Sequence, residues 1–288
     1  MISIVAGAGA WARMKKAIVI CIVGFVLLRW ACTSDGEDRL RLGTFNIEDY
    51  PKSKRQEEAA FALMAGLDAS AIAVQEITEP ERFADAAHQH LGETWRFVHT
   101  GAGTSHRVGL LYDSERLQLD FARDRDELIV YPGAQPAMEV RLLPGSGGST
   151  AAKPLRVFVA HLNAGARGVE PRRRQLAGLA PLLERAARDG DRVVLLGDLN
   201  STSNEDRQAI EDLATRTALH WATREVGCTC FWDRKEDCVG WTLDHVLTSL
   251  KPQAVFTRGP CAEGCEARKS CPLYRDEVSD HCPVAVDL

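Results

Sequence analysis

Apolar and polar residues occur along this chain in blocks that predict strands separated by helices. Arg39–Ile47 and Ala71–Ile77 are apolar runs of strand length, and Lys54–Leu67 between them has apolar residues at helical spacing. The same order of strand, helix and strand returns at Leu155–Asn163, Pro171–Arg188 and Arg192–Asn200. The chain therefore has two halves of similar organisation, which predicts an α/β fold.

Further strands are predicted between and after these halves. They are His106–Asp113, Ala137–Leu143, Trp241–Ser249 and Val278–Leu288. The Gly- and Ser-rich stretch Pro144–Pro154 is predicted to be a surface connector, and no stretch is a linker rich enough to separate two domains. We therefore expect residues 39–288 to form a single domain.

Polar residues gather where the predicted apolar strands end. These residues are Asn46, Glu76, His161, Asn163, Asp198 and Asn200. Any one of them is explained by a turn, because Asp and Asn bond locally to the backbone there. As an ordered set, they resemble the binding edge of an open α/β sheet, where ligands lie beyond the strand ends.

Length and charge limit the functions to be considered. The chain has 288 residues, 45% of them hydrophobic, which is enough to bury a sizeable core. Its formal net charge of -5 and pI near 5.9 argue against a broadly basic coat for nucleic acid. A phosphate-bearing substrate would therefore be bound locally or with the help of a metal ion.

The first 38 residues are predicted to be an export signal rather than part of the fold. Lys15 and Lys16 precede the apolar run Ala17–Leu28, which is shorter than the roughly 20 residues of a membrane span and suits a signal peptide. Translation starts at Met1 or at Met14. The segment is either cleaved, lipidated at Cys32, which follows a small residue, or kept as a membrane anchor.

Cysteine usage agrees with export. Seven of the nine cysteines follow Gly227: Cys228, Cys230, Cys238, Cys261, Cys265, Cys271 and Cys282. Their spacings lack paired C-x-x-C knuckles, which favours disulfides over a zinc site. Disulfides in turn favour an extracytoplasmic location. Because seven is odd, one thiol either stays free or pairs with Cys32.

Six short motifs, "TFNI", "QE", "HLN", "GDLN", "LDHV" and "SDH", occur in this order between Arg39 and Leu288. The set resembles the endonuclease/exonuclease/phosphatase family, which includes deoxyribonuclease I and exonuclease III. The resemblance implies a four-layer α/β sandwich, with two mostly antiparallel or mixed sheets face to face and helices outside. It also implies hydrolysis of phosphate esters with a divalent metal ion.

The resemblance assigns a metal site to three residues. Glu76 is implied as the principal ligand, with Asn46 and Asp280 close to it. Oxygen ligands of this kind suit Mg²⁺, which keeps several waters and takes few protein carboxylates. Mn²⁺ and Ca²⁺ are the alternatives.

The resemblance also implies the catalytic residues. Asp198 would orient or deprotonate the attacking water, and Asn200 would hold a phosphate oxygen. His281 would bind the phosphate or take a proton, with Asp244 accepting a hydrogen bond from it and raising its pKa. His161 matches a second histidine of the deoxyribonuclease I branch.

The chain departs from that branch beside His161. The branch supports this histidine with a glutamate, where this chain has His106 and Arg107, and Arg107 would then contact phosphate. Asn163 and Arg167 are further candidates for phosphate contacts. The basic run Arg172–Arg174 either adds to them or forms a solvated helix face.

The combined interpretation is an exported, metal-dependent phosphodiesterase, first of all an endonuclease acting on DNA. A phosphoesterase acting on phospholipid, as sphingomyelinases do, or on inositol phosphates is the alternative, because "FWDRKED" partly matches an inositol-phosphatase tract. A catalytically silent binding module is the third hypothesis.

We expect a monomer with a nucleic-acid substrate, no obligate protein partner, and membrane anchoring only through the N-terminus. Trp232 and Trp241 would stack on bases or pack within cross-linked loops, and packing is favoured.

Overall fold

The computed structural model describes residues 40–101, 105–145, 152–234 and 236–288, and Leu40–Leu288 form one compact unit. The predicted signal or anchor, with Cys32 in it, lies outside the described residues, as do residues 146–151 of the predicted connector. Within the described ranges, no helix combines the length and apolar composition needed to cross a bilayer.

The unit contains two six-stranded mixed sheets. The first has the order β13-β14-β1-β2-β4-β3. Its strands are β1 (Arg41–Tyr50), β2 (Ala71–Ile77), β3 (Trp95–His99), β4 (Arg107–Asp113), β13 (Ala254–Thr257) and β14 (Val284–Asp287). The second has the order β5-β6-β7-β8-β12-β9. Its strands are β5 (Leu117–Arg125), β6 (Ala137–Pro144), β7 (Leu155–His161), β8 (Arg192–Asp198), β9 (His220–Trp221) and β12 (Asp244–Thr248).

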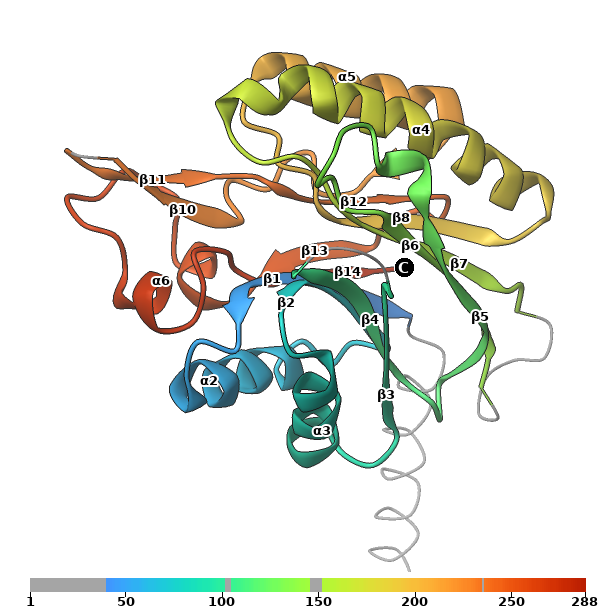
Figure 1. Cartoon of the computed structure of the whole chain (residues 1–288), viewed down its shortest axis with the longest axis horizontal. Helices are drawn as coiled ribbons and strands as arrows, with labels where there is room; N and C mark the ends of the chain where they lie inside the picture. Colours follow the sequence, from blue (N-terminus) through green and yellow to red (C-terminus); the bar gives the residue numbers. More distant parts are fainter. Residues whose placement is uncertain (1–39, 102–104, 146–151, 235) are drawn as a thin grey trace, which may run out of the picture. The chain divides into compact units, whose positions relative to one another are not determined.

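Helices cover the outer face of each sheet, and a separate hairpin follows. The helices are α2 (Lys54–Ala65), α3 (Pro80–Leu91), α4 (Val169–Arg188), α5 (Asn204–Thr217) and the short α6 (Leu273–Glu277). Figure 1 shows α2 and α3 on the first sheet and α4 and α5 on the second. The hairpin consists of β10 (Cys230–Asp233) and β11 (Cys238–Trp241). The predicted four-layer α/β sandwich is therefore confirmed.

The apolar strands are continuous runs because both of their faces are buried. Along β7, Val157 and Val159 belong to the core between the two sheets, whereas Phe158 and Ala160 belong to the core under α4 and α5. A third core lies between the first sheet and α2 and α3. Strands buried on both faces lose the alternation of half-exposed strands. This packing explains why the periodicity of the sequence locates the strands without assigning their faces.

Several predicted boundaries differ from the structure. The first strand continues to Tyr50, and α4 begins at Val169, before the predicted Pro171. The predicted last strand Val278–Leu288 is regular only over Val284–Asp287. Its beginning is a loop because the Ser279 hydroxyl donates to the Asn46 carbonyl and accepts from the His281 amide. These side-chain bonds replace the backbone bonds of a strand.

The C-terminal cysteines form three disulfides rather than a zinc site. The pairs are Cys228–Cys265, Cys238–Cys271 and Cys261–Cys282. Among the described cysteines, Cys230 remains as a buried free thiol. The three bonds join segments between residues 228 and 282 that contain little regular structure, so cross-links take the place of an extensive core there.

We expect peptide mapping under non-reducing conditions to recover these three cross-links, with Cys230 alkylated only after unfolding. Reduction should lower the melting temperature, since removing a native disulfide typically costs about 2–5 kcal/mol. Thermal unfolding with and without a thiol reductant measures the effect. Free thiols at all seven positions in protein from an oxidising compartment would contradict the assignment.

Candidate active site

Polar side chains from both sheets meet at one edge of the sandwich. In the second sheet, Asp198 is paired with His161 on one side and with Asp244 on the other. In the first sheet, Asn46 lies near the end of β1, and Glu76 near the end of β2. The predicted clustering of these residues is therefore observed, although they come from five different strands.

Asn46 connects the two sheets within this cluster. Its Nδ2 donates to Glu76 Oε1 at 3.0 Å and to Asp198 Oδ2 at 3.1 Å. Its Oδ1 accepts from the Glu48 backbone N–H at 3.0 Å. Asn46 is 1% exposed, so its amide has no competing water and these bonds hold both carboxylates in place.

The backbone at Glu76 is unusual and helps to orient its carboxylate. Glu76 has φ +62, and the pairing of β2 with β4 is irregular between Val74 and Ile77. A non-glycine residue in this left-handed region is strained and is found where surrounding contacts enforce it, often at functional sites. The second carboxylate oxygen, Oε2, accepts from the Asp49 backbone N–H at 3.2 Å.

The tip of β8 is built in a similar way. Asn200 has φ +52, and its backbone N–H donates to Asp198 Oδ1 at 2.9 Å. Its Nδ2 donates to the Leu162 carbonyl at 3.0 Å, which ties the tip of β8 to the end of β7. Asp198 is 2% exposed, so its carboxylate is held rigidly in a site with little water.

His281 and Asp244 form a buried pair. His281 Nδ1 lies 2.7 Å from Asp244 Oδ2, and His281 Nε2 lies 3.6 Å from Asp198 Oδ2. Burial alone would lower the pKa of His281, but Asp244, Asp198 and Asp280 together raise it well above its ordinary value. The surrounding carboxylates therefore favour the protonated form of the ring. Within the described part of the chain, Asp244 Oδ1 is buried and has no hydrogen-bond partner.

Negative charge accumulates on the other side of His281. Burial raises the pKa of Asp280 to about 6, with Glu48, Glu76 and Asp198 adding to the shift and His281 opposing it. The Asp280 backbone N–H donates to Glu48 Oε2 at 2.9 Å. A divalent cation beside these carboxylates would relieve their mutual repulsion.

His161 lies in the cluster with less support than His281. Its Nε2 is 3.5 Å from Asp198 Oδ2 and 3.8 Å from Glu76 Oε1, beyond normal hydrogen bonds. Among the described residues, its buried Nδ1 has no partner. This ring lacks the carboxylate that orients His281, in agreement with the departure noted in the sequence.

The predicted phosphate-binding residues lie farther out. Asn163 Oδ1 accepts from the Tyr131 hydroxyl, and Asn163 is partly exposed after β7. Arg107 begins β4 and is half-buried, and Arg167 is exposed in the 3-10 turn Ala166–Gly168. The structure thus joins eight predicted residues in one network, Asn46, Glu76, His161, Asp198, Asn200, Asp244, Asp280 and His281. The other three lie outside this network.

Arg172 has a role that the sequence did not indicate. It is 0% exposed, so it is neither a phosphate ligand at the surface nor part of a solvated helix face. Nε and Nη2 donate to the Asp206 carboxylate at 2.8 and 2.6 Å, and Nη1 donates to the carbonyls of Asn163 and Gly165, each at 2.8 Å. Nη2 also donates to Thr202 Oγ1 at 3.0 Å. One buried guanidinium therefore holds both loops that follow β7 and β8.

Two further residues lie next to Glu76. His106 Nε2 lies 2.5 Å from Asp49 Oδ1, and Asp49, Glu76 and His106 present ligand atoms within 4.8 Å of one another. His106 was noted in the sequence only as a departure from the family pattern, and Asp49, an exposed residue of β1 beyond "TFNI", was missed. Their proximity depends on the pairing of β1, β2 and β4 in one sheet.

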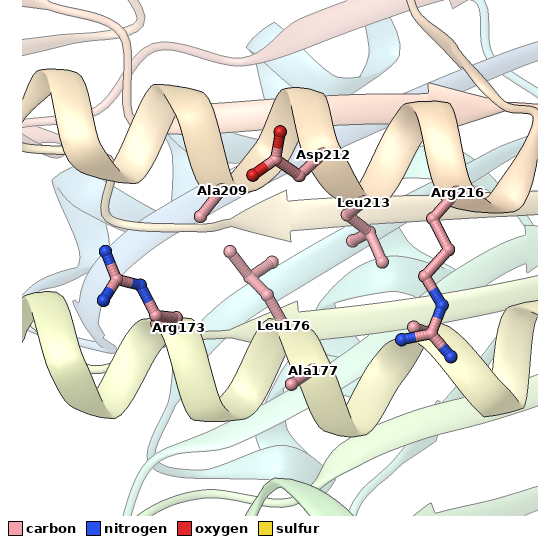
Figure 2. Close-up of a pocket in the computed structure, with 8 residues that line it drawn as sticks. Arg173, Leu176, Ala177, Ala209, Asp212, Leu213 and Arg216 are labelled. Atoms are coloured by element: carbon pink, nitrogen blue, oxygen red, sulfur yellow. The ribbon is translucent and has the colours of Figure 1, made fainter.

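A groove elsewhere on the molecule lacks this chemistry. It lies between α4 and α5, has a volume of ≈ 200 Å³, and is lined mainly by Leu176, Ala177, Ala180, Ala209 and Leu213. Figure 2 shows Arg173, Asp212 and Arg216 at its borders. The helices separate it from the strand ends, so we exclude it from the candidate site.

The chain is similar to a known protein family over most of its length. The model for the Endonuclease/Exonuclease/phosphatase family matches residues 43–281. A search of the curated proteins found no match.

Among solved structures, D. rerio TDP2 complexed with single strand DNA product is 12% identical, with a TM-score of 0.62, and the alignment covers 86% of this chain and 98% of that one. The human Nocturnin catalytic domain with bound sulfate anion is 15% identical, with a TM-score of 0.62 and coverage of 86% and 93%. An AP Endonuclease from Archaeoglobus fulgidus is 14% identical, with a TM-score of 0.59 and coverage of 86% and 98%. At these identities the similarity establishes the fold alone.

Replacing Arg172 tests its place in the structure. We expect Arg172→Met to lower the free energy of unfolding by about 3–5 kcal/mol, because it leaves the Asp206 carboxylate buried without its partner. Arg173→Met, at the exposed next position, is the control and should change stability by less than about 0.5 kcal/mol. Denaturant titration compares the two, and equal effects would rule out this role for Arg172.

Proposed function

This chain belongs to the Endonuclease/Exonuclease/phosphatase family, whose members hydrolyse phosphodiester bonds, and from that premise we propose that it is an exported, divalent-metal-dependent nuclease acting on DNA. The observation that carries the proposal is the arrangement around Asn46. Glu76, Asp198 and the Asp244–His281 pair meet there. These groups meet the three needs of phosphodiester hydrolysis, which are to neutralise the phosphate, activate water and stabilise the leaving oxygen.

The donor set fits a hard divalent cation. Glu76 and Asp280 offer carboxylate oxygens, and their closeness contributes to the raised pKa of Asp280. We assign them as ligands of Mg²⁺, with Mn²⁺ or Ca²⁺ as substitutes, and Asn46 as the residue that sets the position of Glu76. When bound, the ion supplies charge neutralisation at the phosphate.

His281 and Asp198 perform the proton chemistry in this proposal. His281 is held as a cation by Asp244, so it donates a hydrogen bond to a phosphate oxygen and stabilises charge that develops there. Asp198, fixed by Asn46 and by the Asn200 backbone, accepts the proton of the attacking water. The distance of 3.6 Å between His281 Nε2 and Asp198 Oδ2 supports a role for both residues at the same phosphate.

The remaining predicted residues have supporting parts. The Asn200 amide has two N–H donors, one of which binds the Leu162 carbonyl, and we assign the other to a phosphate oxygen. His161 Nε2 lies near Asp198 and donates to the same phosphate. Three residues outside the network contact neighbouring phosphates, namely Asn163, Arg107 and Arg167.

Nucleic acid is the favoured substrate class. D. rerio TDP2, with the same fold, has been crystallised with a single strand DNA product, and an AP endonuclease shares the fold as well. Three disulfides support the proposal that the protein works outside the cytoplasm, exported or anchored through residues 1–38.

A substrate panel tests the function directly. Purified protein is incubated with Mg²⁺ and, in separate reactions, with plasmid DNA, RNA, sphingomyelin vesicles and inositol phosphates, each with and without EDTA. Cleavage of DNA that EDTA abolishes is the expected result. Product from sphingomyelin or inositol phosphates alone would replace the nuclease by the alternative phosphoesterase, and no turnover of any substrate would favour a silent binding module.

Glu76→Gln tests the metal ligand. It removes one charge without changing volume, so we expect a near-native melting temperature, weaker Mg²⁺ binding in calorimetry and an activity loss on the order of 100-fold or more. Glu81→Gln, at an exposed position in α3, is the matched control and should keep full activity. Wild-type turnover by Glu76→Gln, or activity in excess EDTA, would refute the assignment.

A double-mutant cycle tests the Asp244–His281 pair. We expect His281→Ala to lower kcat by a factor on the order of 100 or more, and Asp244→Asn to cost most of that. Because the two residues act together, the double variant should be scarcely slower than His281→Ala. Exposed His220→Ala is the control. Losses that multiply would mean that Asp244 does not act through His281.

A further inference from the structure

Two tryptophans of the β10–β11 hairpin are exposed beside a small buried core. Trp232 is 48% exposed and Trp241 is 40% exposed. The small core there is formed by Phe231 and cysteines, which corrects the expectation that both tryptophans pack within the cross-linked loops. Large exposed aromatic side chains that sit close together often mark a binding surface.

The strand register relates these tryptophans to the active site. Cys230 is paired with Trp241 across the hairpin and, on its other side, forms an antiparallel bridge with His281. Residues opposite each other in antiparallel pairs point to the same face, so His281, Cys230 and Trp241 form one row. Two strand spacings separate the ends of this row, which is about 10 Å between backbones.

Trp232 extends the same face. It lies two residues after Cys230 and is paired with Val239, so its side chain projects from the side that carries Trp241 and the His281 ring. The disulfides Cys228–Cys265 and Cys238–Cys271 anchor the ends of this hairpin to the segment that precedes His281. The aromatic surface is thereby held in a defined place beside the catalytic centre.

A cavity lies beside Trp241. It has a volume of ≈ 360 Å³ and lies beside Ser201 and Thr202, which directly follow Asn200. Arg207 and Trp241 lie on its wall. The volume is within the range of roughly 300–1,000 Å³ of ligand pockets, and an aromatic face with hydroxyls and a guanidinium matches the base, sugar and phosphate of a nucleotide.

We propose that Trp241 and Trp232 form a stacking platform for bases next to the scissile phosphate, and that the substrate is therefore single-stranded or locally unpaired nucleic acid. The proposal rests on the nuclease function proposed above. In a regular duplex both faces of each base are occupied by neighbouring bases, so only an unpaired base can stack on these rings. The distance of about 10 Å suits the nucleotide adjacent to the cleaved one.

The charges at the tip of the hairpin argue against insertion into a lipid surface. Its tip carries Asp233, Glu236 and the exposed ion pair of Arg234 with Asp237, whose Nη2 and Oδ2 are 2.6 Å apart. A hairpin that enters a bilayer would have apolar residues at its tip. Trp232 and Trp241 instead lie along the strands, on the face that carries His281.

The test compares a short single-stranded DNA, the same sequence as a blunt duplex, and ethyl 4-nitrophenyl phosphate, a diester without a base. For Trp241→Ala and Trp232→Ala we expect kcat/KM on the single strand to fall about tenfold each, mainly through KM, as stacking on one aromatic side chain is lost. Trp→Phe at each position should restore most of it. Cleavage of the base-free diester should be unchanged, and the wild-type protein should prefer the single strand to the duplex.

Leu273→Ala, which removes an apolar side chain that is 73% exposed, is the control for loss of surface area. If the wild-type protein cleaves both DNA substrates and the tryptophan variants match it, the platform is overturned while the nuclease stands. If the base-free diester is cleaved and no nucleic acid is, the proposed function itself fails. Loss of binding to sphingomyelin vesicles by Trp232→Ala, with DNA cleavage intact, would assign the hairpin to membranes instead.

Discussion

The hydrogen bonds that Asn46 donates across the sandwich are the interaction on which the site depends. One amide group contacts Glu76 in its own sheet and Asp198 in the facing sheet, at 3.0 and 3.1 Å. Because Asn46 is almost fully buried, a lost partner would leave polar atoms without water or protein to bond. The two sheets therefore hold the carboxylates of Glu76 and Asp198 in a single arrangement.

A buried arginine holds the two loops that follow β7 and β8 in the second sheet. Arg172 binds the loop after β7 and the loop after β8 with one guanidinium, and Asp206 balances its charge inside the protein. The same logic applies to the last loop, where Ser279 binds the Asn46 carbonyl and Tyr274 donates to the His281 carbonyl. Positioned acid and base groups need such support, since small displacements are costly to catalysis.

Disulfides stabilise the segment between β12 and β14. This segment contains Asp280 and His281 of the cluster and has only a short strand and short helices. The Cys261–Cys282 disulfide fixes the residue that follows His281. The backbone of Cys230 forms an antiparallel β-bridge with His281. The disulfides therefore help to hold the position of His281 in the cluster.

The sequence by itself determined the class of fold, the main strands and the identity of the clustered residues. These features are local, because apolar runs and polar strand ends can be read from neighbouring positions. Tertiary structure alone decided the disulfide partners, the burial of Arg172, the contact of His106 with Asp49 and the exposure of Trp241. Each of these depends on which distant segments become neighbours when two sheets pack face to face, and residue pattern carries no such distance information. The short motifs contain the residues that cluster, but only packing places an amide of one sheet within hydrogen-bond reach of a carboxylate in the other.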